Sequence, residues 1–153
     1  MKKLMMKTVL GAWCLVLGAG VAKADLAVTN EVVVLATGGT IAGVHEDRSA
    51  VTGYQAGVVG ADDLLRAVPE VSRIAKIRSR QVFQMASENM TLDKVFALAD
   101  AVREELARPS VHGVVITHGT DTMEESAYLL NLVLDTVKPV VFVGAMRPAT
   151  AYG

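Results

Sequence analysis

The chain has 153 residues, of which 52% are hydrophobic, and a formal net charge of −1, so it is long enough for one modest domain. Its first 24 residues hold four lysines and no acidic residue, and without them the chain keeps 11 basic and 16 acidic residues. This acidic balance argues against nucleic acid as a partner, because nucleic-acid-binding proteins need a basic face.

Residues 1–24 have the pattern of a cleavable export signal. A lysine-rich start is followed by a short uncharged apolar run, and Ala22-Lys23-Ala24 offers small residues at both recognition positions for cleavage. The run is too short to span a bilayer well, since a spanning helix needs about 20 residues. We therefore expect a mature chain that starts at Asp25, resides in the periplasm or outside the cell, and has no membrane contact. The single cysteine, Cys14, leaves with the signal, so no disulfide is expected.

The mature chain alternates strand-like and helix-like segments. Three continuous apolar or β-branched runs, at 32–36, 114–117 and 140–143, predict buried parallel strands. Apolar residues at helical spacing predict helices over 61–68, 91–107 and 123–134, and the first two end before a proline. Residues 73–85 alternate in places and are interpreted as one or two further strands. This order predicts an α/β fold, a three-layer Rossmann-like domain with a largely parallel sheet.

The loops that follow the three predicted strands should meet at one cleft, because parallel sheets bind ligands beyond the carboxyl ends of their strands. These loops are residues 37–43, 118–122 and 144–148, and the first two are rich in glycine and threonine. The first loop matches neither the phosphate-binding lysine motif nor the dinucleotide motif. Its paired glycines instead predict free backbone N–H groups for an oxyanion, next to the hydroxyl of Thr40.

Structural roles are open for several of these residues. Thr37 and Thr40 could cap a turn, and Asp121 could cap a helix. Residues 87–89 could likewise cap the helix that is predicted to start near Thr91. His118 is interpreted as structural. No histidine or cysteine has a partner at metal-ligand spacing, so neither a metal nor another cofactor is predicted.

Two long segments together carry a family resemblance. "VVVLATGGTIAG" and "VVITHGTDTMEESAYLL" closely resemble the two signature segments of the bacterial-type L-asparaginases, specifically the exported type II and glutaminase-asparaginase group. "QMASENMT" and "FVGAMRP" also resemble family segments, and the similarity extends from about Glu31 to the last residue. The resemblance implies hydrolysis of the side-chain amide of asparagine, and often glutamine, with release of ammonia. A non-catalytic amino-acid-binding module is the alternative, and a nucleotide-binding α/β domain is a more remote one.

The resemblance also implies catalytic roles. Thr40 matches the nucleophile that forms an acyl-enzyme, and Tyr54 matches a loop tyrosine that assists it. Thr120 matches the second threonine, near the scissile amide. Asp121 matches the aspartate that contacts the α-amino group of the substrate.

Four further residues match substrate-binding positions. Ser87 and Glu88 match the pair that holds the α-carboxylate and α-amino groups, while Gly39 and Gly119 precede the two catalytic threonines. Glutamate at position 88 is similar to the dual-specificity members, since many strict asparaginases have glutamine there. A zwitterionic ligand suits such a site, because it needs hydroxyl and N–H donors at one end and carboxylates at the other.

The sequence departs from the family pattern toward its end. The catalytic lysine of the family lies beyond Gly153, and the lysines after residue 24 are Lys76, Lys94 and Lys138, none of which matches it. The smaller C-terminal domain of the family has no counterpart. We therefore expect residues 25–153 to be a partial N-terminal asparaginase domain, incomplete at its C-terminal side and essentially inactive alone. The homotetramer of full-length members is not implied for these 153 residues.

Overall fold

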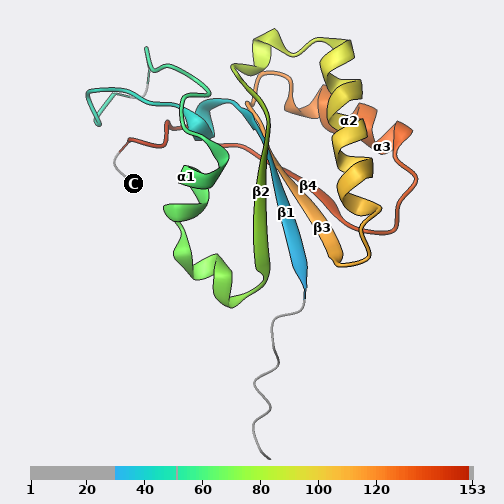
Figure 1. The fold of residues 1–153 in the computed structure, drawn as a ribbon. Coiled ribbons are helices and arrows are strands. Elements are labelled where there is room, and N and C mark those ends of the chain that lie inside the picture. Colours follow the sequence, from blue (N-terminus) through green and yellow to red (C-terminus); the bar gives the residue numbers. More distant parts are fainter. Residues whose placement is uncertain (1–29, 51, 152–153) are drawn as a thin grey trace, which may run out of the picture.

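The computed structural model of the protein describes residues 30–50 and 52–151. Within them, four parallel strands form one open sheet in the order β2-β1-β3-β4 (Figure 1). The strands are β1 (Glu31–Gly38), β2 (Lys76–Met85), β3 (Val111–Thr117) and β4 (Val140–Val143). The predicted parallel α/β sheet is thus confirmed, and the segment around residues 73–85 contains a single strand.

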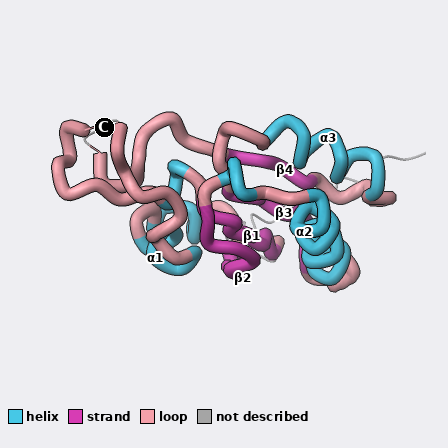
Figure 2. Tube along the Cα trace, turned by 90° about the horizontal axis from the view of Figure 1, so that it is seen from above, coloured by secondary structure: helices cyan, strands magenta, loops and turns pink. Residues whose placement is uncertain are grey.

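Helices cover both faces of the sheet. The short helix α1 (Ala61–Arg66) lies on one face beside β2, whereas α2 (Leu92–Leu106) and α3 (Met123–Val133) lie on the other (Figures 1 and 2). Three short 3₁₀ turns, η1 (Thr40–Ala42), η2 (Pro69–Arg73) and η3 (Ser87–Asn89), complete the connections. The arrangement has three layers, as predicted.

The main core lies between the sheet and the pair α2 and α3. Leu35 and Ile116 project from the two central strands and are fully buried against Leu98 and Val102 of α2 and Leu130 of α3. The apolar stripe of α2 recurs at a spacing of three or four residues, which places one face of the helix on the sheet. Two apolar residues of α2, Leu92 and Phe96, are nevertheless exposed.

The strand β4 differs from the prediction. Its continuous apolar run predicts burial on both faces, but its residues alternate between half-buried and exposed. Val140 and Phe142 pack against the core, whereas Val141 and Val143 are exposed. The reason is the position of β4: it is the outermost strand of the described sheet, and α3 covers only one of its faces.

The strand order places a topological switch between β1 and β3. From β1 the chain moves outward to β2, and it then returns past β1 to β3 and continues to β4. Crossovers that leave in opposite directions open a crevice at the carboxyl ends of the two central strands. The fold therefore directs the loops after β1 and β3 to one place.

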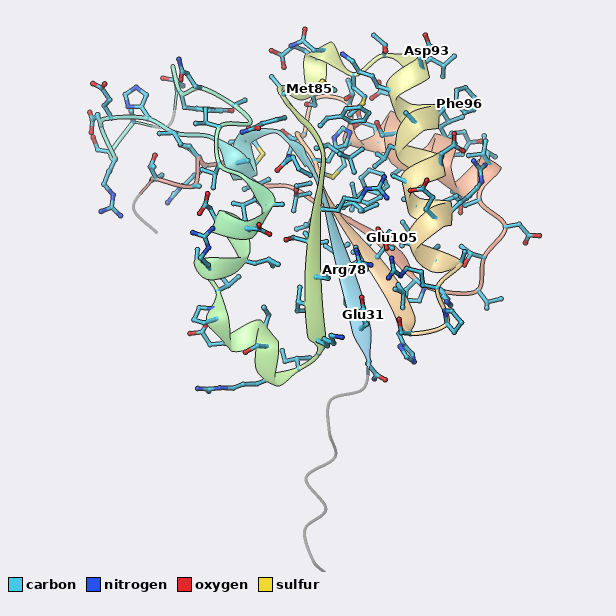
Figure 3. All side chains as sticks on the ribbon, in the orientation of Figure 1. Glu31, Arg78, Met85, Asp93, Phe96 and Glu105 are labelled. Atoms are coloured by element: carbon cyan, nitrogen blue, oxygen red, sulfur yellow. The ribbon has the colours of Figure 1, made fainter. Side chains whose placement is uncertain are left out.

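The opposite, amino-terminal half of the sheet contains a cluster of paired charges. Glu31, Arg78 and Glu105 point toward one another between the sheet and α2 (Figure 3). Arg78 Nε donates to Glu31 Oε1 at 3.0 Å, and its Nη1 donates to Glu105 Oε1 at 3.2 Å. These hydrogen bonds lower the pKa of both carboxyl groups, and they raise that of Arg78. The cluster joins β1, β2 and α2.

No helix within the described ranges is long and apolar enough to cross a membrane. The predicted export signal lies outside the described residues.

Candidate active site

A cleft of about 670 Å³ opens at the carboxyl ends of the strands. Loops that follow all four strands line it, so the predicted convergence of the strand exits is observed. The lining residues are mostly glycines, hydroxyl-bearing residues and acids: Gly39, Thr40, Thr52, Gly53, Tyr54, Ala56, Ala86, Ser87, Glu88, Gly119, Thr120, Asp121 and Met146. All eight site residues predicted from the sequence are among them.

The hydroxyl groups of Thr40 and Tyr54 form a close pair. Thr40 Oγ1 lies 2.6 Å from the Tyr54 oxygen, and either group can be the donor. Thr40 begins the turn η1 directly after β1, and its side chain is buried except for its access to the cleft. The turn-capping alternative for Thr40 is not observed, since its hydroxyl bonds to Tyr54 and not to the backbone of its own turn. The pair is well placed for proton transfer to or from the threonine.

The two glycine loops touch backbone to backbone. Gly39 has a φ of 78°, and a Cβ at this position would lie 2.3 Å from the Gly119 nitrogen. A Cβ on Gly119 would in turn lie 2.3 Å from Ser87 Oγ. Side chains are therefore excluded at both positions, and the loops after β1, β2 and β3 can close on one another.

The expectation of a free N–H group for an oxyanion is wrong for Gly39. The N–H of Gly39 is not free to bind an oxyanion, because it donates to the Met85 carbonyl at 2.8 Å. This bond fastens the β1 loop to the end of β2, and the carbonyl of Gly39 accepts from Gly57 in the loop that carries Tyr54. Gly39 therefore positions its neighbours.

Ser87 and Asp121 form a second polar pair. Ser87 Oγ donates to Asp121 Oδ2 at 2.9 Å and accepts from the Asp121 N–H at 3.2 Å. Thr122 Oγ1 donates to the Ser87 carbonyl at 3.0 Å. Neither Ser87 nor Asp121 caps a helix: the residues at the starts of α2 and α3 are Thr91 and Thr122, and neither makes a side-chain cap bond. The pair joins the loops after β2 and β3.

Two residues behind the loops have structural contacts. Thr37 is buried, and its Oγ1 donates to the Thr117 carbonyl at 2.9 Å, which ties β1 to β3 where their ladder ends. His118 is fully buried, its Nδ1 lies 2.7 Å from the Gly119 carbonyl, and its ring packs edge-on against Phe142. Because a carbonyl only accepts, Nδ1 carries the proton. His118 does not line the cleft, which agrees with its structural interpretation.

The loop that carries Tyr54 is hydrogen-bonded to the segment after β4. Ala149 N donates to the Gly43 carbonyl at 2.9 Å. The hydroxyl of Thr150 accepts from the His45 N–H at 3.0 Å and donates to the His45 carbonyl at 3.2 Å. The position of Tyr54 therefore depends on residues about a hundred positions further along the chain.

The charged residues that line the cleft are Glu88 and Asp121, and neither forms an ion pair with another described residue. The described lysines lie elsewhere: Lys76 is 4.0 Å from Glu31, Lys94 bonds the Asn89 carbonyl, and Lys138 bonds the Leu106 carbonyl. An acidic cleft of this kind suits a ligand with an ammonium group. Groups of His, Cys, Asp and Glu that could hold a metal are not found in residues 30–50 and 52–151.

Sequence reasoning missed several lining residues. Thr52, Gly53 and Ala56 flank Tyr54, and Ala86 precedes Ser87. Met146 lies in the loop after β4, so the strand-exit rule indicated its segment but not its side chain.

The chain resembles known proteins over most of its length. The model of the asparaginase N-terminal domain matches residues 31–153. The chain belongs to the asparaginase family. It is 52% identical over 122 residues to a glutaminase-asparaginase of Acinetobacter glutaminasificans and 48% identical over 118 residues to L-asparaginase 2 of Bacillus subtilis. These alignments cover 80% and 77% of this chain but 37% and 32% of the relatives, so the chain spans about a third of their length.

A solved structure, of a probable cytoplasmic L-asparaginase from Campylobacter jejuni, has a TM-score of 0.78 and 47% identity. The match covers 80% of this chain and 37% of that one. A probable periplasmic L-asparaginase of Haemophilus influenzae is 46% identical over 139 residues, 91% of this asparaginase-family chain and 39% of the relative. The relatives therefore include a probable cytoplasmic and a probable periplasmic L-asparaginase.

Proposed function

We propose that the cleft binds an α-amino acid with a side-chain amide, asparagine or glutamine, and that its chemistry is hydrolysis of that amide. The observation that carries the proposal is the 2.6 Å contact between Thr40 Oγ1 and the Tyr54 hydroxyl at the wall of an acidic cleft. A threonine hydroxyl is a weak nucleophile unless a neighbouring group takes its proton, and Tyr54 is the group in contact with it.

In the proposed reaction, Thr40 Oγ1 bonds to the amide carbon of the substrate and loses its proton. The amide nitrogen gains a proton and leaves as ammonia, so Thr40 then carries the side chain of the substrate as an ester. Water cleaves this acyl-enzyme, which restores the hydroxyl and releases aspartate or glutamate. Tyr54 relays the proton from Thr40, and Thr120, which also lines the cleft, holds the scissile amide.

The polar groups of the substrate have matching partners. The hydroxyl of Ser87 suits the α-carboxylate if its proton turns from Asp121 to the ligand, and the carboxylates of Asp121 and Glu88 suit the α-ammonium group. Glu88 is exposed at the cleft. We propose that this carboxylate favours glutamine beside asparagine, because it offers a charged partner to the ammonium end of the longer substrate.

The test is ammonia release from asparagine and glutamine by the purified chain, with calorimetric binding of both amino acids measured in parallel. Thr40→Ala should remove any turnover, whereas Thr40→Ser, which keeps a hydroxyl, should retain part of it. Thr37→Ser is the matched control, since Thr37 is buried and does not line the cleft. Turnover that survives Thr40→Ala would contradict the proposed nucleophile. If the parent chain acts on asparagine alone and Glu88→Gln has the same preference, the proposed role of Glu88 is contradicted.

A second candidate is an amino-acid-binding module with little or no turnover. It is favoured by the absence of any lysine among the described residues that line the cleft. A catalytic unit that lacks one member loses nearly as much rate as one that lacks all. We therefore propose that this chain alone turns over substrate far more slowly than a complete family member. Binding that is intact in Thr40→Ala, without ammonia release by the parent chain, would support this candidate.

We also propose that the protein is exported and that its first 24 residues are removed. The lysine-rich start, the apolar run and the small residues at 22 and 24 support this proposal. N-terminal sequencing of the protein from its native or a bacterial host decides it. A mature protein that starts at Asp25 is expected, and intact Met1 in the soluble fraction would contradict export.

A further inference from the structure

The loop that joins β1 to α1 extends beyond the sheet and then comes back to it (Figure 1). Residues 54–59 form the returning segment, which begins with Tyr54. Val44 of the outgoing part and Gln55 exchange two backbone hydrogen bonds of 2.9 Å. The segment that carries Tyr54 is therefore fastened to the part of the loop that follows Thr40.

Gly57 is the point at which the returning segment meets the end of β2. Its N–H donates to the Gly39 carbonyl at 3.0 Å. Its φ is 68°, and a Cβ at this position would lie 2.7 Å from the nitrogen and 3.0 Å from the oxygen of Met85. Both are backbone atoms, so no rotation of a side chain can relieve the collision. The close approach of the two backbones therefore requires glycine at position 57.

Gln84 holds the next residue of the returning segment. Its Nε2 donates to the Val58 carbonyl at 2.7 Å. The Val58 N–H donates to the Ala42 carbonyl at 2.7 Å, so both polar groups of the Val58 backbone are bonded. Because Gln84 is exposed near the end of β2, its side chain can be changed without disturbance of the core.

We propose that Gly57 and Gln84 are positioning residues, which fix the returning segment so that the Tyr54 hydroxyl reaches its partner. This role rests on the proposed function, in which Tyr54 takes the proton of Thr40. The connection is short, because Gly57 follows Tyr54 by three positions and bonds to the carbonyl of Gly39, the residue before Thr40. A displaced segment would separate the two hydroxyl groups, and an O–H···O bond needs a separation of about 2.5–3.0 Å.

A nuclear magnetic resonance signal of the Tyr54 ring reports the contact. The chain has three tyrosines, and after carbon-13 labelling of their Cζ atoms, Tyr54→Phe identifies the signal of Tyr54. Thr40→Val removes the hydroxyl partner and should shift this signal in the parent chain. In the background of Gly57→Ala, Thr40→Val should cause little or no shift, because the contact is already lost and the two changes are not additive.

Gly53→Ala is the matched control. Gly53 lies in the same loop and has a φ of 73°, but a Cβ there would meet only His45 Nε2, at 3.9 Å, among the described residues beyond its chain neighbours. The control therefore has a similar backbone strain without a collision against another backbone. In its background, Thr40→Val should still shift the Tyr54 signal.

Gln84→Glu gives the answer if Gly57→Ala does not fold. A glutamate at this position cannot donate to the Val58 carbonyl, so the returning segment loses one of its bonds. The shift that Thr40→Val causes should then be smaller than in the parent chain. Gln81→Glu is the control, because it makes the same change on β2 at a side chain that does not bond the returning segment.

Three results would overturn the proposal: a full Thr40→Val shift in folded Gly57→Ala, a full shift in Gln84→Glu, and the absence of any shift in the parent chain. None of these signals depends on ammonia release. Turnover that survives Thr40→Ala would therefore contradict the proposed function and leave the positioning of Tyr54 as measured.

Discussion

The two ends of the sheet use carboxylates in opposite ways. At the amino-terminal half, the buried Glu31 and Glu105 share the guanidinium of Arg78. At the carboxyl end, Glu88 and Asp121 face a cleft and form no ion pair with a described residue. A charge that is paired inside the molecule makes loss of its partner costly to the fold, whereas a cleft charge that lacks an ionic partner is a candidate to meet a charged ligand.

The ends also differ in how the strands are held together. At the amino-terminal half, long side chains bridge β1, β2 and α2. At the carboxyl end, glycines remove side chains so that backbones can touch, and short hydroxyl groups make the remaining bonds. The first arrangement tolerates small shifts because the side chains are flexible. The second arrangement leaves less room for such shifts, because the backbones approach closely, and it holds the Thr40 and Tyr54 hydroxyl groups next to each other.

The largest expected effect comes from Gly39→Ala. The added Cβ would lie 2.3 Å from the backbone of Gly119, at a φ that disfavours any side chain. We expect a loss of about 2–4 kcal/mol in the free energy of unfolding, together with loss of ligand binding. Urea denaturation measures the change. Gly60→Ala is the control, because its Cβ would have only an ordinary contact at 3.8 Å with Asp63 and should change little.

Asp121→Asn tests the claim that the cleft carboxylates serve a ligand. Removal of the charge should weaken binding of asparagine about 10- to 100-fold, the value of one hydrogen bond to a charged group. Stability should change little, because asparagine keeps an oxygen that can accept from Ser87 Oγ and Asp121 has no ionic partner among the described residues. Calorimetric titration gives the affinity and thermal unfolding gives the stability. Unchanged affinity for asparagine would contradict the claim that the cleft carboxylates bind a ligand.

Arg78→Met tests the claim that the charge cluster at the amino-terminal half of the sheet supports the fold. It removes the cation that the two buried carboxylates share and leaves them the longer contacts with Lys76, at 4.0 Å from Glu31, and Arg80, at 3.4 Å from Glu105. We expect a destabilisation of about 2 kcal/mol. This value is below that of a fully buried pair because about a third of the Arg78 side chain is exposed. Ligand affinity should be unaffected. A variant with parental stability would show that the cluster contributes nothing.

The smallest effect concerns pH. Hydrogen bonds from Arg78 lower the pKa of the Glu105 carboxyl group below its ordinary value of 4.5. The stabilisation is therefore fully present above pH 4.5 and is lost as the pH falls below this value toward the folded-state pKa. Urea denaturation between pH 7 and pH 3 should show this loss. Glu105→Gln should give a flatter curve over the acidic part of the range, and an identical slope would contradict the assignment.

Most of the fold could be predicted from the sequence because its signals are local. Strand runs, helical spacing and the prolines after two helices identify the elements, and one rule about parallel strands places their loops together. All eight site residues that were predicted with this rule and the family resemblance line the cleft. The prediction that β4 is buried on both faces was wrong. Burial depends on which strand is outermost in the described sheet, and no local sequence pattern encodes the order of the strands.

The role of Gly39 was only half predictable. Its sequence context indicates a tight loop next to Thr40, but the partner of its N–H is Met85, 46 positions away. The ion-pair cluster was missed for the same reason. Glu31, Arg78 and Glu105 are ordinary surface-type residues in the sequence, and only the packing of α2 on the sheet buries and pairs them.

The anchoring of the Tyr54 loop by Ala149 and Thr150 has a consequence for protein synthesis. Thr40 and Tyr54 are translated early, but the bonds from His45 to Thr150 span 105 positions. Until Ala149 and Thr150 have been added, the loop that carries Tyr54 lacks these hydrogen-bond partners. Contacts of such large sequence separation form late in folding. We therefore expect the contact between the Thr40 and Tyr54 hydroxyl groups to become fixed only after the segment that follows β4 has emerged.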